Sequence, residues 1–241
     1  MSVGLSGPTF ITARDLYASS AEKQQALGQR GEDTYGRKFR YVKAGATALV
    51  VDNVIQSPAR DTQFTGMAVA SAAAIGVTTL ALTNGTTTTT LDEFAGGIAV
   101  VSESTGIGQQ FIIAGNTVAT SGAALTVTLK DGVRVALTTS SKVTLWKNLY
   151  NGVIVSPTTR TGKTVGGAIF PIAANEYGWI QTGGPGAALS DVTVSAVGEA
   201  VSPSTTTAGA VTKQVTLLEN IGTTPILGVS AKVSPIFWSI D

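Results

Sequence analysis

The sequence contains neither cysteine nor histidine among its 241 residues. Without cysteine the chain has no disulfides, no thiolate metal ligands and no cysteine nucleophile. Without histidine it lacks the commonest general base, the commonest metal ligand and the central member of every serine–histidine–aspartate triad. These two absences exclude most hydrolase mechanisms. We therefore predict a protein that is not an enzyme and that uses no metal or cofactor.

Charged side chains are also scarce. They make up 13% of the residues, and 16 Lys and Arg nearly balance 15 Asp and Glu, which leaves a net charge of +1. Such a chain has no overall field to attract nucleic acid or an anionic membrane, so we predict neither as a partner. No stretch approaches the roughly 20 apolar residues of a membrane-spanning helix, and residues 1–10 lack the features of a signal peptide. The sequence therefore predicts a soluble protein made in a cytoplasm.

What the sequence does contain is an apolar, glycine-rich composition. Hydrophobic residues make up 43% of the chain, glycine occurs 28 times, and the mean hydropathy is +0.27. This is too apolar for a disordered chain, and the length can supply a core for roughly one to three small domains. Short β-branched segments alternate with turn sequences such as Asn84-Gly85 and Asp131-Gly132. We predict a mainly β fold of antiparallel sandwich or barrel regions with a short N-terminal helical or extended arm.

The predicted strands fall into three groups. Around Gly45, residues 38–43 alternate charged and apolar side chains, which predicts Phe39 and Tyr41 on one face and the Lys and Arg side chains on the other. Residues 48–56 form a second, β-branched strand in this group. The middle of the chain contains the candidates 78–82, 97–102, 109–113, 125–129 and 142–145. The C-terminal part contains the candidates 152–155, 168–173, 177–182, 191–197, 212–218 and 226–238.

One helix is predicted, over residues 12–29. Thr12 is suited to the N-cap position, and the segment is composed largely of good helix formers. Its apolar stripe of Leu16, Ala21 and Leu27 is thin, so such a helix needs a partner surface to be stable. Within residues 86–90, the run of threonines predicts an exposed loop or an edge strand.

The chain divides into three predicted parts. Residues 1–35 form an N-terminal arm, residues 36–63 and 151–241 form a β body, and residues 64–150 form a β-rich middle domain. Strands after residue 150 could pair with strands before Pro58, and the middle domain would then be an insertion into a discontinuous body. Consecutive domains remain the alternative.

Charge is concentrated at the start of the chain. Residues 1–61 hold 14 charged residues, whereas residues 62–241 hold 17. Within the first segment lie the candidate partner-binding residues Arg14, Arg30, Arg37, Lys38, Arg40 and Lys43. The five from Arg30 to Lys43 are interleaved with the aromatic residues Tyr35, Phe39 and Tyr41. This cluster could bind single-stranded nucleic acid by charge and stacking, or it could form the charged face of an arm that docks on an acidic protein. The acidic pair Glu32-Asp33 and the near-neutral chain favour the protein partner.

Several motifs carry weaker signals for chemistry. Gly162-Lys163-Thr164 ends like a phosphate-binding loop, but Pro157 stands where that motif needs its first glycine and no convincing helix follows. Adjacent carboxylates such as Asp92-Glu93 point apart on a strand, which disfavours a glycosidase pair or a calcium loop. We expect Trp179 and Trp238 in the core or at a subunit interface rather than on a sugar platform.

Several passages of the sequence have a common texture of strands and turns rather than catalytic signatures. They are residues 36–45, 148–157, 177–189, 198–204 with 208–211, and 225–230. These passages resemble tailed-bacteriophage virion structural proteins, in particular the β-rich cement or decoration proteins of capsid shells.

This resemblance implies a structural role in which several copies, often trimers, clamp neighbouring major capsid subunits. We therefore expect a virion protein, made in the host cytoplasm, that binds the outside of the capsid shell as a homotrimer and stabilises it. Residues 1 to about 60 would face the major capsid protein. The alternative is a host-recognition module of a head or tail fibre that binds glycan through exposed aromatic residues. A glycan depolymerase that uses a carboxylate pair is a third hypothesis.

Overall fold

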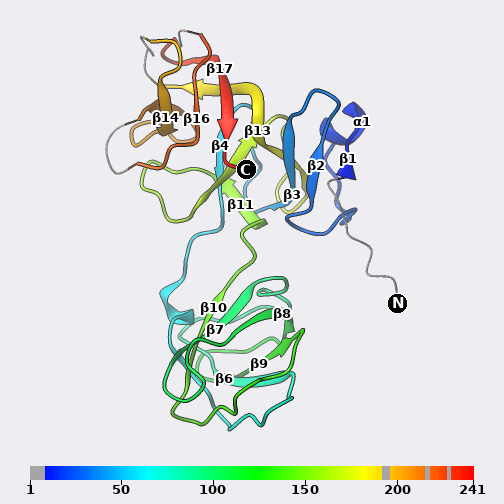
Figure 1. The fold of residues 1–241 in the computed structure, drawn as a ribbon, viewed down its shortest axis with the longest axis vertical. Coiled ribbons are helices and arrows are strands. Elements are labelled where there is room, and N and C mark those ends of the chain that lie inside the picture. The colour runs from blue at the N-terminus through cyan, green and yellow to red at the C-terminus, as the bar shows by residue number, and fades with distance from the viewer. Residues whose placement is uncertain (1–8, 192–195, 215–217, 227–228) are drawn as a thin grey trace. The chain divides into compact units, whose positions relative to one another are not determined.

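The computed structural model describes residues 9–191, 196–214, 218–226 and 229–241 (Figure 1). The protein is mainly β, with 42% strand and 3% helix, as its sequence predicts. It divides into two compact units: unit 1 combines Met1–Ala59 with Leu149–Asp241, and unit 2 is Arg60–Asn148. Among the described residues, no helix has the length and apolarity to cross a membrane.

Unit 1 contains a sheet of eleven strands in its described residues, in the order β1-β2-β3-β11-β4-β12-β13-β15-β14-β16-β17. Because β3 also pairs with β13, five of these strands close into a small mixed barrel. The elements of unit 1 are β1 (Thr9–Phe10), α1 (Ala13–Leu16), β2 (Arg30–Glu32), β3 (Lys38–Ala44), β4 (Val54–Gln56), β11 (Asn151–Val155), β12 (Thr164–Ala168), β13 (Tyr177–Ser190), β14 (Ala200–Pro203), β15 (Val211–Lys213), β16 (Gly222–Thr223) and β17 (Lys232–Ser239).

The barrel of unit 1 is filled by one β-branched residue from each of its five strands. These residues are Val42, Ile55, Val153, Val165 and Ile180, all of them buried in one cluster. Since successive side chains of a strand point to opposite faces, the neighbours of these residues project outward and form separate clusters. The outside of the barrel therefore carries two further buried clusters. One of them lies under residues 9–35, which we call the N-terminal segment.

The N-terminal segment packs against the barrel instead of extending from it as an arm. Its β1 pairs in parallel with β2, and β2 pairs with β3. Ile11 and Leu16 are buried in a cluster with Phe39, Tyr41 and Trp179. Burial of these two side chains stabilises the segment by roughly 1.5–3 kcal/mol each. Residues 9–35 are thus part of the folded body.

The helix predicted over residues 12–29 is much shorter. Only Ala13–Leu16 is helical, with the Thr12 hydroxyl donating to Asp15 Oδ2 at 2.6 Å. The remainder is held by single contacts, such as the hydrogen bond from Gln24 N–H to the Tyr41 hydroxyl at 3.1 Å. The thin apolar stripe explains the difference, because Ala21 is exposed and gives a longer helix nothing to bury.

Unit 2 is a nearly closed antiparallel barrel of six strands in the order β5-β10-β7-β8-β9-β6. A bridge between Val69 and Leu82 continues the pairing from the first strand to the last. Its core includes Phe64 and Phe94, whose rings meet edge to face at 4.7 Å. The elements are η1 (Thr62–Phe64), β5 (Met67–Ala68), β6 (Thr79–Thr83), β7 (Ile98–Glu103), β8 (Gln110–Asn116), β9 (Ala124–Leu129) and β10 (Lys142–Trp146).

All five strands predicted in the middle of the chain are confirmed, with differences only at their ends. The prediction for residues 48–56 is wrong over most of its length: only Val54–Gln56 is a strand, after a turn in which Asp52 has a φ of 63°. The prediction for residues 168–173 is also wrong, because the strand is Thr164–Ala168. Gly167 lies within this strand, where a Cβ would collide with the Trp238 ring.

The remaining C-terminal predictions fall partly outside the described residues. Strands at 152–155 and 177–182 are confirmed, and the second continues to Ser190. Residues 192–195, 215–217 and 227–228 are not described. Of the predictions that cross them, β15 and β17 confirm strand at 212–213 and 232–238, whereas the described residues of 191–197, and residues 214, 218, 226 and 229–231, are not in strands.

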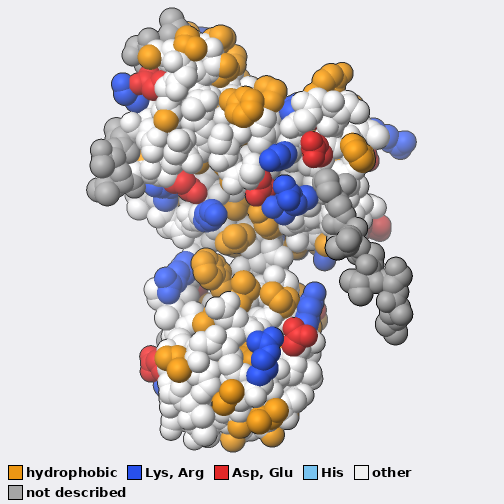
Figure 2. All heavy atoms as spheres, in the orientation of Figure 1, with side chains coloured by type: hydrophobic (Ala, Val, Ile, Leu, Met, Phe, Trp, Pro, Cys, Tyr) orange, Lys and Arg blue, Asp and Glu red, His pale blue; other side chains and the backbone are white. Residues whose placement is uncertain are grey.

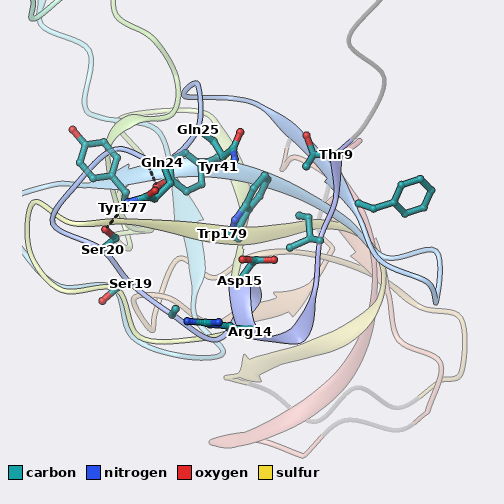
Figure 3. A pocket seen from close by; sticks show the side chains of 13 residues that line it. Thr9, Arg14, Asp15, Ser19, Ser20, Gln24, Gln25, Tyr41, Tyr177 and Trp179 are labelled. Atoms are coloured by element: carbon teal, nitrogen blue, oxygen red, sulfur yellow. Dashed lines mark hydrogen bonds between the residues drawn. The ribbon is translucent and has the colours of Figure 1, made fainter.

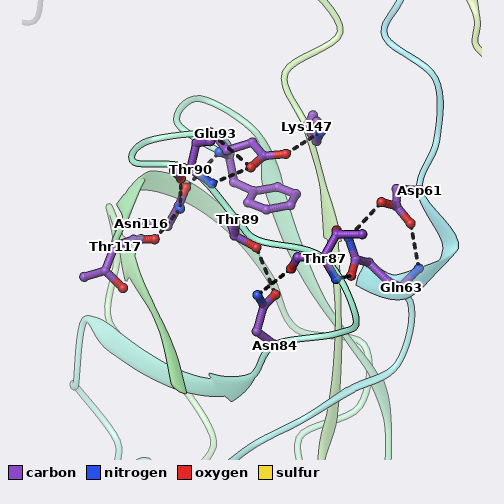
Figure 4. A network of polar contacts seen from close by, with 11 residues as sticks. Asp61, Gln63, Asn84, Thr87, Thr89, Thr90, Glu93, Asn116, Thr117 and Lys147 are labelled. Carbon is purple, nitrogen blue, oxygen red and sulfur yellow. Dashed lines mark hydrogen bonds and ion pairs between the residues drawn. The ribbon is translucent and has the colours of Figure 1, made fainter. Parts of the chain in front are cut away.

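The threonine-rich loop of unit 2 is not wholly exposed, contrary to expectation. Thr89 is fully buried and donates to Asn84 Oδ1 at 2.9 Å (Figure 4). The Asn84 amide in turn donates to the carbonyl oxygens of Thr87, Ala119 and Thr120 at 2.9–3.0 Å. One buried side chain therefore satisfies backbone groups from two loops that would otherwise lose their hydrogen bonds with water.

We expect Asn84→Ala to lower the free energy of unfolding of unit 2 by about 1–3 kcal/mol, because it leaves buried carbonyl groups unsatisfied. Hydrogen exchange followed by mass spectrometry should show faster exchange in peptides from residues 60–148 and unchanged exchange in unit 1. Gln110→Ala, at an exposed position of β8, is the control and should change neither. Unchanged exchange in Asn84→Ala would show that the loops are held by other contacts.

Candidate functional site

The pairing of β1, β2 and β3 places one group of charged side chains together on the outer face of these strands. Phe10 is in register with Glu32, Glu32 with Lys38, and Arg30 with Arg40. Residues paired in this way project from the same face of a sheet. The opposite face carries the buried cluster of Ile11 and Phe39, so these five side chains point outward. We call Phe10, Arg30, Glu32, Lys38 and Arg40 the charged face.

Basic and acidic side chains lie beside one another on the visible face of unit 1 (Figure 2). On the charged face, Arg40 binds Asp241 through two contacts, Nε to Oδ2 at 2.5 Å and Nη2 to Oδ1 at 3.1 Å. Its Nη1 donates to the Gly28 carbonyl at 2.8 Å, and its guanidinium lies 5.7 Å from the centre of the Tyr150 ring. The hydrogen bonds to Asp241 raise the pKa of Arg40 despite its partial burial. The guanidinium group of Arg40 is therefore already occupied by contacts within unit 1.

Arg37 is committed in a similar way, in the turn between β2 and β3. Its Nε donates to Asp33 Oδ2 at 2.6 Å, and Asp33 Oδ1 accepts the N–H groups of Tyr35 and Arg37 at 2.9 and 3.0 Å. Burial alone would raise the pKa of Asp33, but these hydrogen bonds and the charge of Arg37 hold it below its ordinary value. The closed turn presents Tyr35 with 81% of its surface exposed.

The six basic residues singled out from the sequence do not form one patch. Arg30, Lys38 and Arg40 share the charged face, and Arg37 lies in the adjoining turn. Lys43 lies on the same face of β3 as Phe39 and Tyr41, with Nζ 5.6 Å from the centre of the Tyr177 ring. The prediction that placed it opposite those aromatic residues is wrong, because Lys43 is separated from Tyr41 by two positions in a regular strand. Arg14 lies on α1 and is not part of the charged face.

Arg14 lines a pocket of about 260 Å³ that lies wholly within unit 1 (Figure 3). The N-terminal segment forms one side of the pocket, and β3 and β13 form the other. The residues around it are Thr9, Phe10, Ile11, Arg14, Asp15, Ala18, Ser19, Ser20, Gln24, Gln25, Tyr41, Tyr177 and Trp179.

Three aromatic rings form the inner wall of this pocket. Tyr41 and Tyr177 lie nearly parallel with their centres 6.1 Å apart, and Tyr41 meets Trp179 edge to face at 5.1 Å. Figure 3 shows the Trp179 ring between Arg14 and Asp15 on one side and Gln24 and Gln25 on the other. Hydrogen bonds from the Thr12 hydroxyl and N–H hold the pKa of Asp15 below its ordinary value, so this carboxylate is charged at neutral pH.

Sequence reasoning missed the exposed aromatic residues that accompany these charges. Phe10 is 79% exposed and Tyr17 is 50% exposed, and both lie in the N-terminal segment with Tyr35. In unit 2, Trp146 is 60% exposed and lies in register with Ile98 of β7. The alternation of β10, in which Val143 and Leu145 are buried, is the signal that places Trp146 on the outer face. The expectation for Trp179 and Trp238 is confirmed, because both are buried in the core.

The phosphate-loop-like string does not form a phosphate site. Thr164 begins strand β12 and is fully buried, and Gly162 lies against Ser57 with no space for a side chain. Within the part of the chain that the structure describes, no three acidic side chains come together in a way that could hold a metal ion. Comparison of the chain with protein-family models, curated proteins and solved structures found no match.

The ion pairs of unit 1 predict a loss of stability in acid. The pKa values of Asp33 and Asp241 are lowered in the folded state, so the stability that they contribute is present above the ordinary aspartate pKa, about 3.9. That contribution is lost as the pH falls below it. We expect urea unfolding at about pH 7 to show a lower midpoint for Asp33→Asn than for the unchanged protein.

The difference between Asp33→Asn and the unchanged protein should shrink at about pH 3, below the ordinary aspartate pKa, where the unfolded chain takes up a proton that the ion pair in the folded state opposes. Asparagine keeps the acceptor for the turn N–H groups, so this comparison isolates the charge of the pair with Arg37. Asp131→Asn, at an exposed position in unit 2, should leave the midpoint unchanged. A constant difference at both pH values would contradict a role for the ion pair.

Proposed function

We propose that this protein is a tailed-phage virion structural protein that binds the outside of the capsid shell as a decoration protein and stabilises it. Its partner would be the major capsid protein. The observation that carries the proposal is the charged face with the neighbouring Tyr35, where exposed aromatic and arginine side chains lie together on a rigid sheet. Protein interfaces are enriched in these residue types, and a rim of charges of both signs supplies orientation.

Some arginine side chains of unit 1 are already held in ion pairs and one is not, which points to a specific docking residue. Arg37 and Arg40 are held by Asp33 and Asp241, whereas Arg30 is exposed and forms no ion pair among the described residues. The charge of Arg30 helps to lower the pKa of Asp241, but a partner carboxylate could pair with Arg30 without first breaking an ion pair of its own. The paired residues keep the sheet surface rigid, which reduces the entropy lost on binding.

The low charge of the rest of the chain is consistent with a protein that attaches in many copies, each through a contact of modest affinity. Residues 62–241 hold 17 charged residues in 180 positions, so long-range attraction contributes little there. A protein that occupies many equivalent positions on a lattice, or that attaches as a trimer, gains affinity from the number of its contacts. Each single contact can then be small.

Point changes test this proposal better than removal of the N-terminal segment, because its residues Ile11 and Leu16 belong to the core. We expect Arg30→Glu combined with Tyr35→Ser to weaken binding at least about tenfold, since a charged hydrogen bond and an aromatic contact are lost. The measurement is cosedimentation with capsids of the same phage that lack this protein. Circular dichroism should show an unchanged fold.

A matched pair of changes in unit 2, Lys130→Glu with Ile107→Ser, serves as the control and should cosediment like the unchanged protein. Equal binding by both double variants would show that the charged face is not the docking surface. Failure of the unchanged protein to cosediment with capsids at any concentration tested would overturn the decoration role itself.

A further inference from the structure

We propose that the pocket between the N-terminal segment and strands β3 and β13 binds one neutral sugar ring. The proposal does not depend on attachment to a capsid, and of the charged face only Phe10 borders this pocket. Its basis is the combination of an aromatic inner wall with exposed polar side chains, two of which, Arg14 and Gln25, form no ion pair or side-chain hydrogen bond among the described residues. A volume of about 260 Å³ lies just below the range of about 300–1,000 Å³ for drug-sized ligands, so a single ring suits it better than a chain.

The polar groups of the pocket are available to a ligand. Among the described residues, Arg14 forms no ion pair and the Gln25 side chain forms no hydrogen bond. The Gln24 amide has one long contact, to Ser20 Oγ at 3.5 Å. The Thr12 contacts to Asp15 both reach Oδ2, so Oδ1 remains able to accept a hydrogen bond. The pocket thus offers donors and acceptors on both sides of the Trp179 ring (Figure 3).

The charged and amide groups around the pocket indicate which class of ligand would bind there. An anion such as phosphate would be attracted by Arg14 but repelled by the adjacent Asp15, and a cation would meet the reverse. Since the two charges cancel, a neutral ligand with many hydroxyl groups fits best: each hydroxyl can donate to Asp15 and accept from Arg14 or an amide. The apolar C–H face of a pyranose ring would lie against the ring of Tyr177, which is partly exposed, whereas Tyr41 and Trp179 are buried behind it.

A partner's apolar side chain is the competing occupant, and the pocket suits it less well. The rim carries Arg14, Asp15, Gln24 and Gln25, all exposed, and a side chain that entered would cover these groups without giving them hydrogen-bond partners. A sugar satisfies them as it binds. The affinity for a single ring should be weak, on the order of millimolar, as expected for a ligand with few non-hydrogen atoms.

The test is saturation-transfer NMR on the full chain with four separate probes. These are the methyl glycosides of glucose, galactose and mannose, and N-acetylglucosamine, each at millimolar concentration. We expect transfer to the ring C–H protons of at least one probe. Arg14→Ala and Gln25→Ala should each weaken binding about tenfold, as loss of a hydrogen bond to a bound ligand does. The matched controls Arg60→Ala and Gln110→Ala, which lie outside the pocket, should bind like the unchanged protein.

Three results would overturn the proposal. One is the absence of transfer to all four probes. Another is binding that Arg14→Ala and Gln25→Ala leave unchanged, which would place the sugar elsewhere. The third is displacement of the sugar by inorganic phosphate, which would make the pocket an anion site. If no probe binds and these two variants instead lose cosedimentation with capsids, the pocket holds a partner side chain, and the decoration role survives without the sugar.

Discussion

Unit 1 depends on the register of one strand, β13. Residues from Tyr177 to Gly183 pair with β3, and residues from Gly183 to Ser190 pair with β17. The same strand also pairs with β12 through Ile180 and Gln181. A shift of one residue would exchange Trp179 in the pocket wall with Ile180 in the barrel core, and every later pair would change face with them. The barrel, the pocket and the C-terminal sheet are therefore set by a single alignment.

The bend in β13 shows how that alignment is held. Gly184 has a φ of 84°, which other residues rarely adopt, and the Gln181 amide donates to the carbonyl oxygens of Gly183 and Pro185 at 3.1 and 2.8 Å. Gly186 brings the backbone close to the Trp238 ring, where a Cβ would collide with the indole. The glycine-rich residues 183–186 are thus part of a bent strand, and the contacts at the bend come from β13 itself and from β17.

The sequence predicts features that depend on neighbouring residues and misses contacts between residues that are far apart in the chain. Strands of unit 2 could be placed because alternation and turn dipeptides act over a few residues, as in Lys142–Trp146. Lys43 could have been placed correctly by the same alternation. The partner of Arg40 could not, because Asp241 is 201 positions away, and no local pattern links the two residues. The pocket was equally hidden, since its inner wall needs the pairing of β3 with β13.

The two crossings between the units lie at neighbouring strands of the body. Unit 2 follows β4 and precedes β11, and these strands are antiparallel partners, with Ile55 opposite Val155 and Gln56 opposite Ile154. Where these strands pair, a few residues from the crossings, they lie about 4.8 Å apart, the spacing of adjacent strands. In unit 1, the whole of unit 2 takes the place of the hairpin loop that would otherwise join β4 to β11. Such a site accepts exchange: a short turn or a foreign domain with close termini could replace unit 2 without changing the register of the barrel.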